Sequence, residues 1–125
     1  MIRPAIGAQI AQTRPAGTSA VAGYTAPSQQ AVEITSVFVA NTTGSDVQMS
    51  LYHDNAGGST FDQTTALYYT VTVPGNSSFT LSSESMGMGI VLSPSAQLGV
   101  QSSVSNALTF TIYGAVESRA PGGGI

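Results

Sequence analysis

The sequence contains no lysine, cysteine or tryptophan, and only 7% of its 125 residues are charged, against roughly 25% in an ordinary soluble domain. Without cysteine the chain has no disulfide, no thiolate metal ligand and no cysteine nucleophile. Its three arginines, Arg3, Arg14 and Arg119, stand near the two ends. Because clustered basic side chains are needed to hold phosphate groups, we expect the chain to bind neither nucleic acid nor an anionic membrane.

Long apolar runs are also missing. The uncharged stretch from Ser85 to Val116 is interrupted by serine, glycine, glutamine, asparagine and threonine, so it lacks the roughly 20 apolar residues of a membrane-spanning helix. The first residues carry a proline and a glycine where a signal peptide would have an unbroken apolar stretch. The length fits one soluble domain with a core of its own.

Residues 1–31 differ in composition from the rest of the chain. Proline and glycine punctuate a run of alanine, serine, threonine and glutamine, which is too poor in apolar surface to fold by itself. This composition predicts an N-terminal arm that is extended, or that forms a short helix over about 4–13, where isoleucines recur every four residues. The arm is either disordered in isolation or docks on a neighbouring molecule. Its candidate partner-binding residues are Ile2, Arg3, Ile6, Ile10 and Arg14.

From residue 32 onward the apolar residues alternate with polar ones. This period of two, in segments rich in β-branched and aromatic residues and separated by turn-forming residues, predicts short antiparallel strands. The predicted strands are 32–40, 47–53, 66–73, 78–82, 89–93, 97–103 and 108–117. We therefore expect an all-β sandwich over 32–117, followed by a flexible tail over 118–125. The pattern leaves open whether the sandwich is a jelly roll or immunoglobulin-like.

The alternation also predicts which side chains face inward, because successive strand residues point to opposite faces. The predicted core residues are Val47, Met49, Leu51, Leu67, Tyr69, Val71, Val73, Phe79, Leu81, Leu108, Phe110 and Ile112. The predicted outer face, neutral and rich in hydroxyl groups, comprises Gln48, Ser50, Tyr52, Tyr68, Thr70, Thr72, Thr109, Thr111 and Tyr113.

A β-sandwich with so few charges has little protection for its strand edges. Soluble monomers usually block edge-to-edge pairing with charge, above all lysine, or with bulges and proline. One interpretation is that copies of the chain or another protein cover these edges in the working state. The alternative is that short edges solvated by serine and threonine are sufficient.

The only histidine, His53, is followed by Asp54 and, further on, Asp62, in the stretch "HDNAGGSTFD". One histidine and two carboxylates resemble part of a metal or acid–base site, but a transition-metal site normally takes three or four ligands. A calcium loop would need an alternating acidic pattern that is missing here. The residues instead favour a turn, in which Gly57 and Gly58 adopt positive φ angles and Asp54 and Asn55 cap the backbone. We find no catalytic, metal or cofactor motif and expect no enzyme activity.

The stretch "YHDNAGGSTFDQTTALYYTVTVPGNSSFTL", followed by "GIVLS", "LGVQSS" and "NALTFTIYG", resembles small β-sandwich virion structural proteins of tailed bacteriophages. The shared features are a His-Asp hairpin, a "TTALY" strand, a Pro-Gly turn and a closing "ALTFTIYG" strand, within residues 34–114. Domains of this kind serve as capsid decoration or cement proteins, as head–tail or tail adaptors, and as fibre components.

The resemblance implies a non-enzymatic decoration or cement protein, made in the host cytoplasm and placed in the virion on the capsid exterior. Its implied partners are further copies of the chain, as a homotrimer, and the major capsid protein or another virion protein. An arm laid across neighbouring subunits would add contact area, and many weak contacts on a lattice give avidity.

The alternative from another functional class is a tail, adaptor or fibre component with a glycan- or receptor-binding module. Aromatic platforms on a sheet face can hold sugars, and Tyr52, Tyr68 and Tyr113 are the candidates. The same tyrosines would equally suit contact with a sister subunit, because tyrosine is enriched at protein interfaces.

Overall fold

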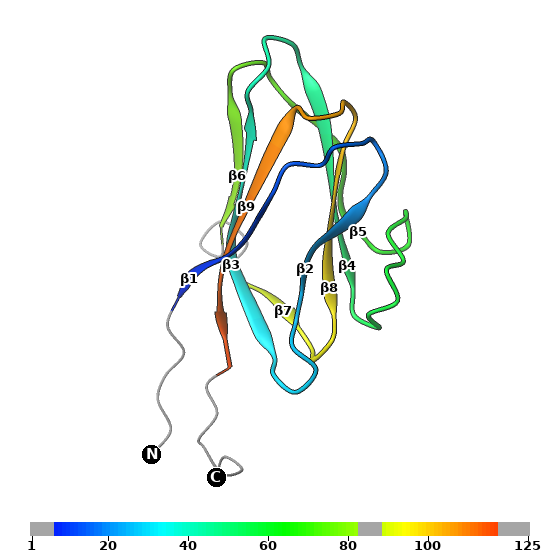
Figure 1. Cartoon of the computed structure of the whole chain (residues 1–125), viewed down its shortest axis with the longest axis vertical. Coiled ribbons are helices and arrows are strands. Elements are labelled where there is room, and N and C mark those ends of the chain that lie inside the picture. Colours follow the sequence, from blue (N-terminus) through cyan, green and yellow to red (C-terminus); the bar gives the residue numbers. More distant parts are fainter. Residues whose placement is uncertain (1–6, 83–88, 118–125) are drawn as a thin grey trace.

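The computed structural model describes residues 7–82 and 89–117, which form two antiparallel β-sheets packed face to face (Figure 1). Sheet A contains β1 (Ala8–Thr13), β9 (Leu108–Val116), β3 (Val32–Asn41), β6 (Ser78–Ser82) and β7 (Ile90–Leu92). Sheet B contains β2 (Val21–Thr25), β8 (Gln97–Ser102), β4 (Val47–Asp54) and β5 (Ala66–Val73). The predicted all-β sandwich is confirmed. No helix that could span a membrane occurs in the described ranges.

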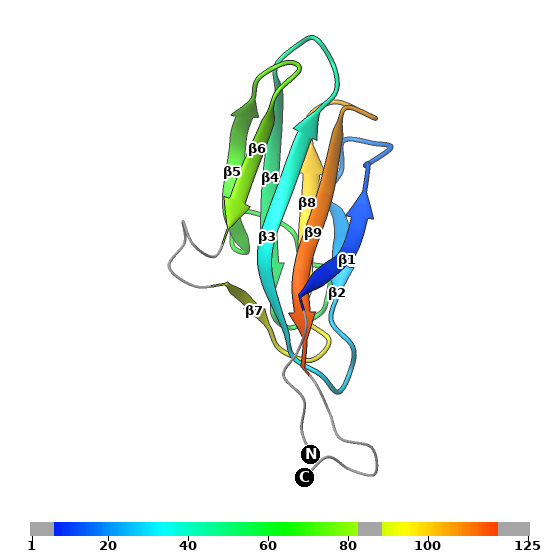
Figure 2. The same cartoon turned by 90° about the vertical axis from the view of Figure 1, so that its left-hand side faces the viewer.

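The strand order identifies the sandwich as a jelly roll. Sheet A runs β1-β9-β3-β6, with the short β7 also pairing with β3, and sheet B runs β2-β8-β4-β5. The chain therefore pairs like one long antiparallel hairpin rolled into two layers, with β1 against β9, β2 against β8, β3 against β6 and β4 against β5. This is the double-sheet arrangement of jelly rolls. Figure 2 shows sheet A in front, with β6, β3, β9 and β1 side by side.

The core lies between the two sheets and is built from alternate residues of the central strands. Valine, leucine, isoleucine, methionine and one phenylalanine fill it at 0–3% exposure. Most of the predicted inward residues are found there. Fully buried members include Ile34, Val37, Val39, Met49, Leu51, Val73, Leu92, Leu98, Val100, Leu108, Phe110 and Ile112.

The segment expected to be an arm belongs mostly to the sandwich. Residues 8–13 form β1 and pair with β9, and residues 21–25 form β2 and pair with β8, so the expected helix is not formed over its described part. Ile10 and Tyr24 pack against the core. This segment is too poor in apolar residues to fold alone. Its two strands lie at the outer edges of the sheets, β1 in sheet A and β2 in sheet B, where each needs to bury side chains on one face only. Residues 1–6 and the expected tail at 118–125 lie outside the described residues.

The predicted alternation of β5 is wrong in its first half. Leu67 and Tyr69 were expected inside but are 42% and 48% exposed, whereas Tyr68 packs against the core beside Phe79. The reason is a β-bulge, since Met49 pairs with Val71 and Leu51 with Tyr68, which sets two residues of β5 opposite Ser50. The extra residue places Tyr68 on the inner face and Leu67 on the outer face, and a second irregularity follows where the pairing passes from Leu51–Tyr68 to Tyr52–Ala66.

Tyr52 lies on the outer side of sheet B as expected, yet only 2% of it is exposed. Phe61, in the connection between β4 and β5, covers it with the ring centroids 6.1 Å apart. Tyr52 pairs with Gly99 of β8, and a Cβ at Gly99 would lie 2.4 Å from the Phe61 ring. Glycine at this position therefore makes room for the aromatic cover.

Hydrogen bonds from Asn41 tie the connection between β3 and β4 to the end of β5. The Asn41 side chain, 3% exposed, donates through Nδ2 to the carbonyl oxygens of Ser45, Val73 and Pro74 at 2.8, 2.9 and 3.2 Å. Its Oδ1 accepts hydrogen bonds from the backbone N–H and the hydroxyl of Thr43. Within the described ranges, every buried side-chain nitrogen and oxygen has a hydrogen-bond partner.

Candidate functional site

The histidine loop is organised by Asp54 at the end of β4. The Asp54 carboxylate accepts hydrogen bonds from the backbone N–H groups of Ala56, Gly58 and Thr60 at 3.0, 3.0 and 2.7 Å. These bonds, led by that from Thr60, hold the pKa of Asp54 below its ordinary value. Gly57 has a φ of 75°, as the turn interpretation expects, whereas the other positive φ falls on Ser59 and not on Gly58. Asp54 therefore acts as a backbone cap.

The two other members of the predicted cluster are also used locally. Asp62 accepts hydrogen bonds from the hydroxyl and the backbone N–H of Thr64, and these lower its pKa, the hydroxyl contributing most. His53 Nε2 lies 3.3 Å from Asn55 Oδ1. In the part of the chain that the structure describes, no three histidine, cysteine or acidic side chains are grouped to hold a metal ion. The hydrogen bonds support the turn interpretation of this stretch.

The hydrogen-bonded carboxylates of Asp54 and Asp62 should make the stability of the fold depend on pH. Because the folded-state pKa values of Asp54 and Asp62 lie below the ordinary value of about 3.9, both carboxylates stabilise the fold above that pH. The contribution is lost as pH falls through the lowered values. We expect the urea midpoint to fall on acidification below pH about 4, and Asp54→Asn to show a weaker pH dependence. Amide hydrogen exchange at Ala56, Gly58 and Thr60 checks this, and an unaltered acid profile in the variant would contradict it.

The three candidate tyrosines do not converge on one platform. Tyr52 is buried under Phe61 on sheet B, Tyr68 points into the sandwich, and Tyr113 lies on the outer face of sheet A. A single site made of all three is therefore not formed. Two further aromatic residues that face outward, Phe38 and Tyr69, were not among the candidates.

The described arm candidates make contacts inside the molecule. Ile10 packs against the core, and Arg14 donates to the hydroxyls of Thr42 and Thr109 and to the carbonyl of Asn106. Both therefore stabilise the position of β1 beside β9. The remaining candidates, Ile2, Arg3 and Ile6, lie outside the described residues.

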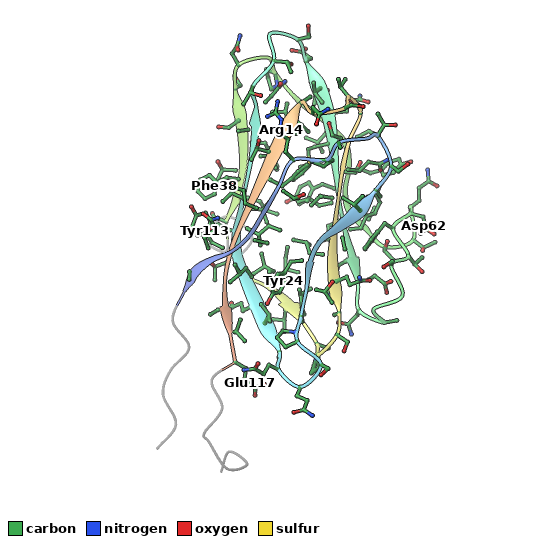
Figure 3. All side chains as sticks on the ribbon, in the orientation of Figure 1. Arg14, Tyr24, Phe38, Asp62, Tyr113 and Glu117 are labelled. Atoms are coloured by element: carbon green, nitrogen blue, oxygen red, sulfur yellow. The ribbon has the colours of Figure 1, made fainter. Side chains whose placement is uncertain are left out.

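The outer face of sheet A carries an aromatic pair beside a hollow. Phe38 of β3 is 42% exposed, and its ring meets Tyr113 of β9 edge to face with centroids 5.6 Å apart. Figure 3 shows both side chains projecting from sheet A away from sheet B, on the side opposite Asp62. The hollow has a volume of about 490 Å³. Its lining residues are Gly7, Ala8, Thr35, Ser36, Phe38 and Tyr113.

The outer face of sheet B carries a second, smaller and more polar hollow of about 100 Å³. It is lined by Gln48, Ser50, Tyr69, Thr70, Gln101 and Ser103. Gln48, Ser50 and Thr70 were correctly predicted to face outward, Gln101 and Ser103 were assigned to no face, and Tyr69 was wrongly predicted to lie in the core. A signal for the bulge was missing, since threonine rarely adopts the positive φ that Thr70 has here.

No protein-family model matches the sequence, and no curated protein matches it. A chain in a structure of infectious bursal disease virus, Gx strain, is similar over 97% of this chain and 34% of its own length, with 12% identity and a TM-score of 0.49. A chain in a crystal structure of tomato aspermy virus is similar over 95% of this chain and 79% of its own, with 15% identity and a TM-score of 0.35. The protein thus spans about a third of the length of the bursal disease virus chain.

Proposed function

We propose that this chain is a non-enzymatic virion structural protein, a decoration or cement protein that stabilises a shell by binding its capsid subunits from the outside. Two features support the proposal. The strand order is that of a jelly roll, an architecture used by viral capsid domains. The motifs of residues 34–114 resemble virion structural proteins of tailed bacteriophages.

The observation that carries the proposal is the absence of charge from the outer strands of both sheets. Neither a charged residue nor a proline occurs in β1, β2, β5 or β6. Bulges interrupt the pairing of β1, β2 and β5, whereas the pairing of β6 with β3 has no irregularity. Since monomers usually protect edges with charge, proline or bulges, the uncharged and regular β6 is the outer strand best suited to being covered by another chain.

The outer face of sheet A is the proposed surface for a capsid subunit. It exposes Phe38 and Tyr113 around the hollow, and aromatic side chains in such positions commonly dominate binding energy. Gly7 and Ala8, with which the described residues begin, line the same hollow. We therefore retain Ile2, Arg3 and Ile6 as attachment residues and propose a homotrimer as the assembled form.

Cosedimentation with undecorated shells tests the proposal. Phe38→Ser is expected to lower occupancy about tenfold or more without unfolding the chain, because Phe38 is already 42% exposed. The matched control is Val104→Ser, which removes an apolar side chain of 45% exposure in the connection between β8 and β9. Removing residues 1–6 tests the attachment segment, whereas removing 1–31 would delete β1 and β2. If the unaltered chain does not sediment with shells, the proposed function is wrong.

A further inference from the structure

We propose that the hollow on the outer face of sheet B is a binding site for a neutral saccharide, with Tyr69 as its stacking surface. The proposed saccharide site lies on sheet B, whereas the proposed capsid-binding surface lies on sheet A. This inference therefore does not depend on the proposed function. Its starting point is the bulge in β5, where Tyr69 and Thr70 together oppose Ser50 of β4.

The bulge holds an unusual backbone conformation. Thr70 has a φ of 54°, which is an outlier for a β-branched residue, since Cβ then crowds the backbone. The conformation is fixed by a hydrogen bond of 3.0 Å from the Thr70 N–H to the Ser50 hydroxyl oxygen. Its effect is to turn Tyr69 out of the core, leaving 48% of it exposed. Bulges and strained residues of this kind gather at binding sites, where they re-aim a side chain.

The hollow beside Tyr69 retains hydrogen-bonding capacity. The hydroxyl oxygens of Ser50 and Ser103 accept bonds from the N–H groups of Thr70 and Gln48, which leaves both O–H groups able to donate outward. The side-chain amide of Gln48 has no hydrogen bond within the described part of the chain. Gln101 Nε2, which donates to the Thr18 carbonyl, has a second hydrogen to offer. Donors and acceptors therefore converge on one small space.

The chemistry of the lining selects the ligand class. No lining residue is charged, so phosphate, carboxylate or ammonium groups would find no counter-ion there, which disfavours nucleotides and charged peptides. An apolar ligand would leave the hydroxyl and amide groups unpaired. A neutral sugar meets both demands, because its hydroxyls pair with these groups while its C–H face lies on the electron-rich face of Tyr69.

The hollow is large enough for the hydroxyl groups along one edge of a single sugar ring, but not for the ring itself. A volume of about 100 Å³ corresponds to roughly three water molecules, which two or three sugar hydroxyls can replace. The ring itself then rests outside, on Tyr69 and beside Leu67, which is 42% exposed on the same side of β5. For a ligand of about 12 heavy atoms, ordinary ligand efficiency gives a dissociation constant near the millimolar range.

The test is a titration of the isotope-labelled full chain with glucose, galactose and N-acetylglucosamine, followed by NMR. At least one sugar is expected to shift the amide signals of Ser50, Tyr69, Thr70 and Gln101 in a saturable manner. Tyr69→Ala should weaken binding about tenfold or more, while Tyr69→Phe, which keeps the ring, should retain it. Tyr113→Ala removes a tyrosine of the opposite sheet and should leave sugar binding unchanged.

The proposal is overturned if no sugar produces saturable shifts, if glycerol produces the same shifts, or if Tyr69→Ala binds as well as the unaltered chain. N-acetylneuraminic acid provides a charged comparison and is expected to bind more weakly than the neutral sugars. Shell cosedimentation of Tyr69→Ala separates the two proposals, because the loss of sugar binding should leave shell binding unchanged.

Discussion

Replacing Phe110 by alanine is expected to lower the free energy of unfolding by about 3–5 kcal/mol. Phe110, the third residue of β9, pairs with Thr13 on one side and Val39 on the other and is fully buried. Its removal leaves a cavity between the sheets that neighbouring strands, held by pairing on both sides, cannot close. Since domains of this size are stable by only about 5–15 kcal/mol, this loss is a large part of the total.

Urea unfolding followed by circular dichroism measures the Phe110→Ala effect. Phe38→Ala provides the matched control, because it removes the same side chain from the adjacent strand β3 at a site that is 42% exposed. The control should lose only about 1 kcal/mol, mainly its edge-to-face contact with Tyr113. Equal losses in the two variants would contradict the assignment of the core.

Asn41→Asp is expected to destabilise the fold at neutral pH by about 3 kcal/mol or more. The Asn41 Nδ2 group donates to three carbonyl oxygens, and the substitution places a carboxylate oxygen against all three while changing the shape very little. Burial and the loss of donors raise the folded-state pKa of the new aspartate above its unfolded value. The destabilisation should therefore be largest at neutral pH and shrink as pH falls toward about 4.

The same substitution at an exposed asparagine provides the control. Asn55 uses only its acceptor oxygen, toward the Ser93 N–H and His53, and Asn55→Asp keeps that acceptor. We expect a change within about 0.5 kcal/mol. Unfolding midpoints at neutral and acidic pH test both variants, and a neutral-pH stability of Asn41→Asp equal to that of the unaltered chain would show that the Asn41 hydrogen bonds do not hold the loops.

The central strands could be predicted because their sequences alternate without interruption. Along most of β4 and β9 every second residue is apolar, as at Val47, Met49 and Phe110, and the structure buries all three. In β5 the bulge at Thr70 breaks the period, and nothing in the residue type predicts a positive φ for threonine. The face of Tyr69 could therefore not be obtained from the pattern.

The outer strands β1 and β2 were missed for a different reason. Each buries little apolar surface of its own, and a glycine such as Gly23 in β2 weakens the strand signal. Gly23 lies where a Cβ would meet Val100 at 2.9 Å, so its role is set by the neighbouring strand and not by its local sequence. Pairing with β9 and β8, far away in the sequence, fixes these segments.

The candidate site was predictable in its chemistry but not in its location. Composition indicated neutral, hydroxyl-rich faces, and the turn chemistry of Asp54 was correct in the structure. Tyr52 was assigned to an open face because the cover by Phe61 depends on the path of the loop and on Gly99 opposite it. Phe38 became a surface candidate only when the register of β3 was known, since a register shift separates Ile34 from Ser36.

The proposed function requires this charge-poor jelly roll to work as part of a larger particle. Quantitative mass spectrometry of purified virions that carry its gene tests the claim most directly. We expect the chain in a fixed ratio to the major capsid protein, retained through density-gradient purification and accessible to surface labelling. Its absence from purified virions, with the chain recovered only as a free monomer in the infected cell, would contradict the account.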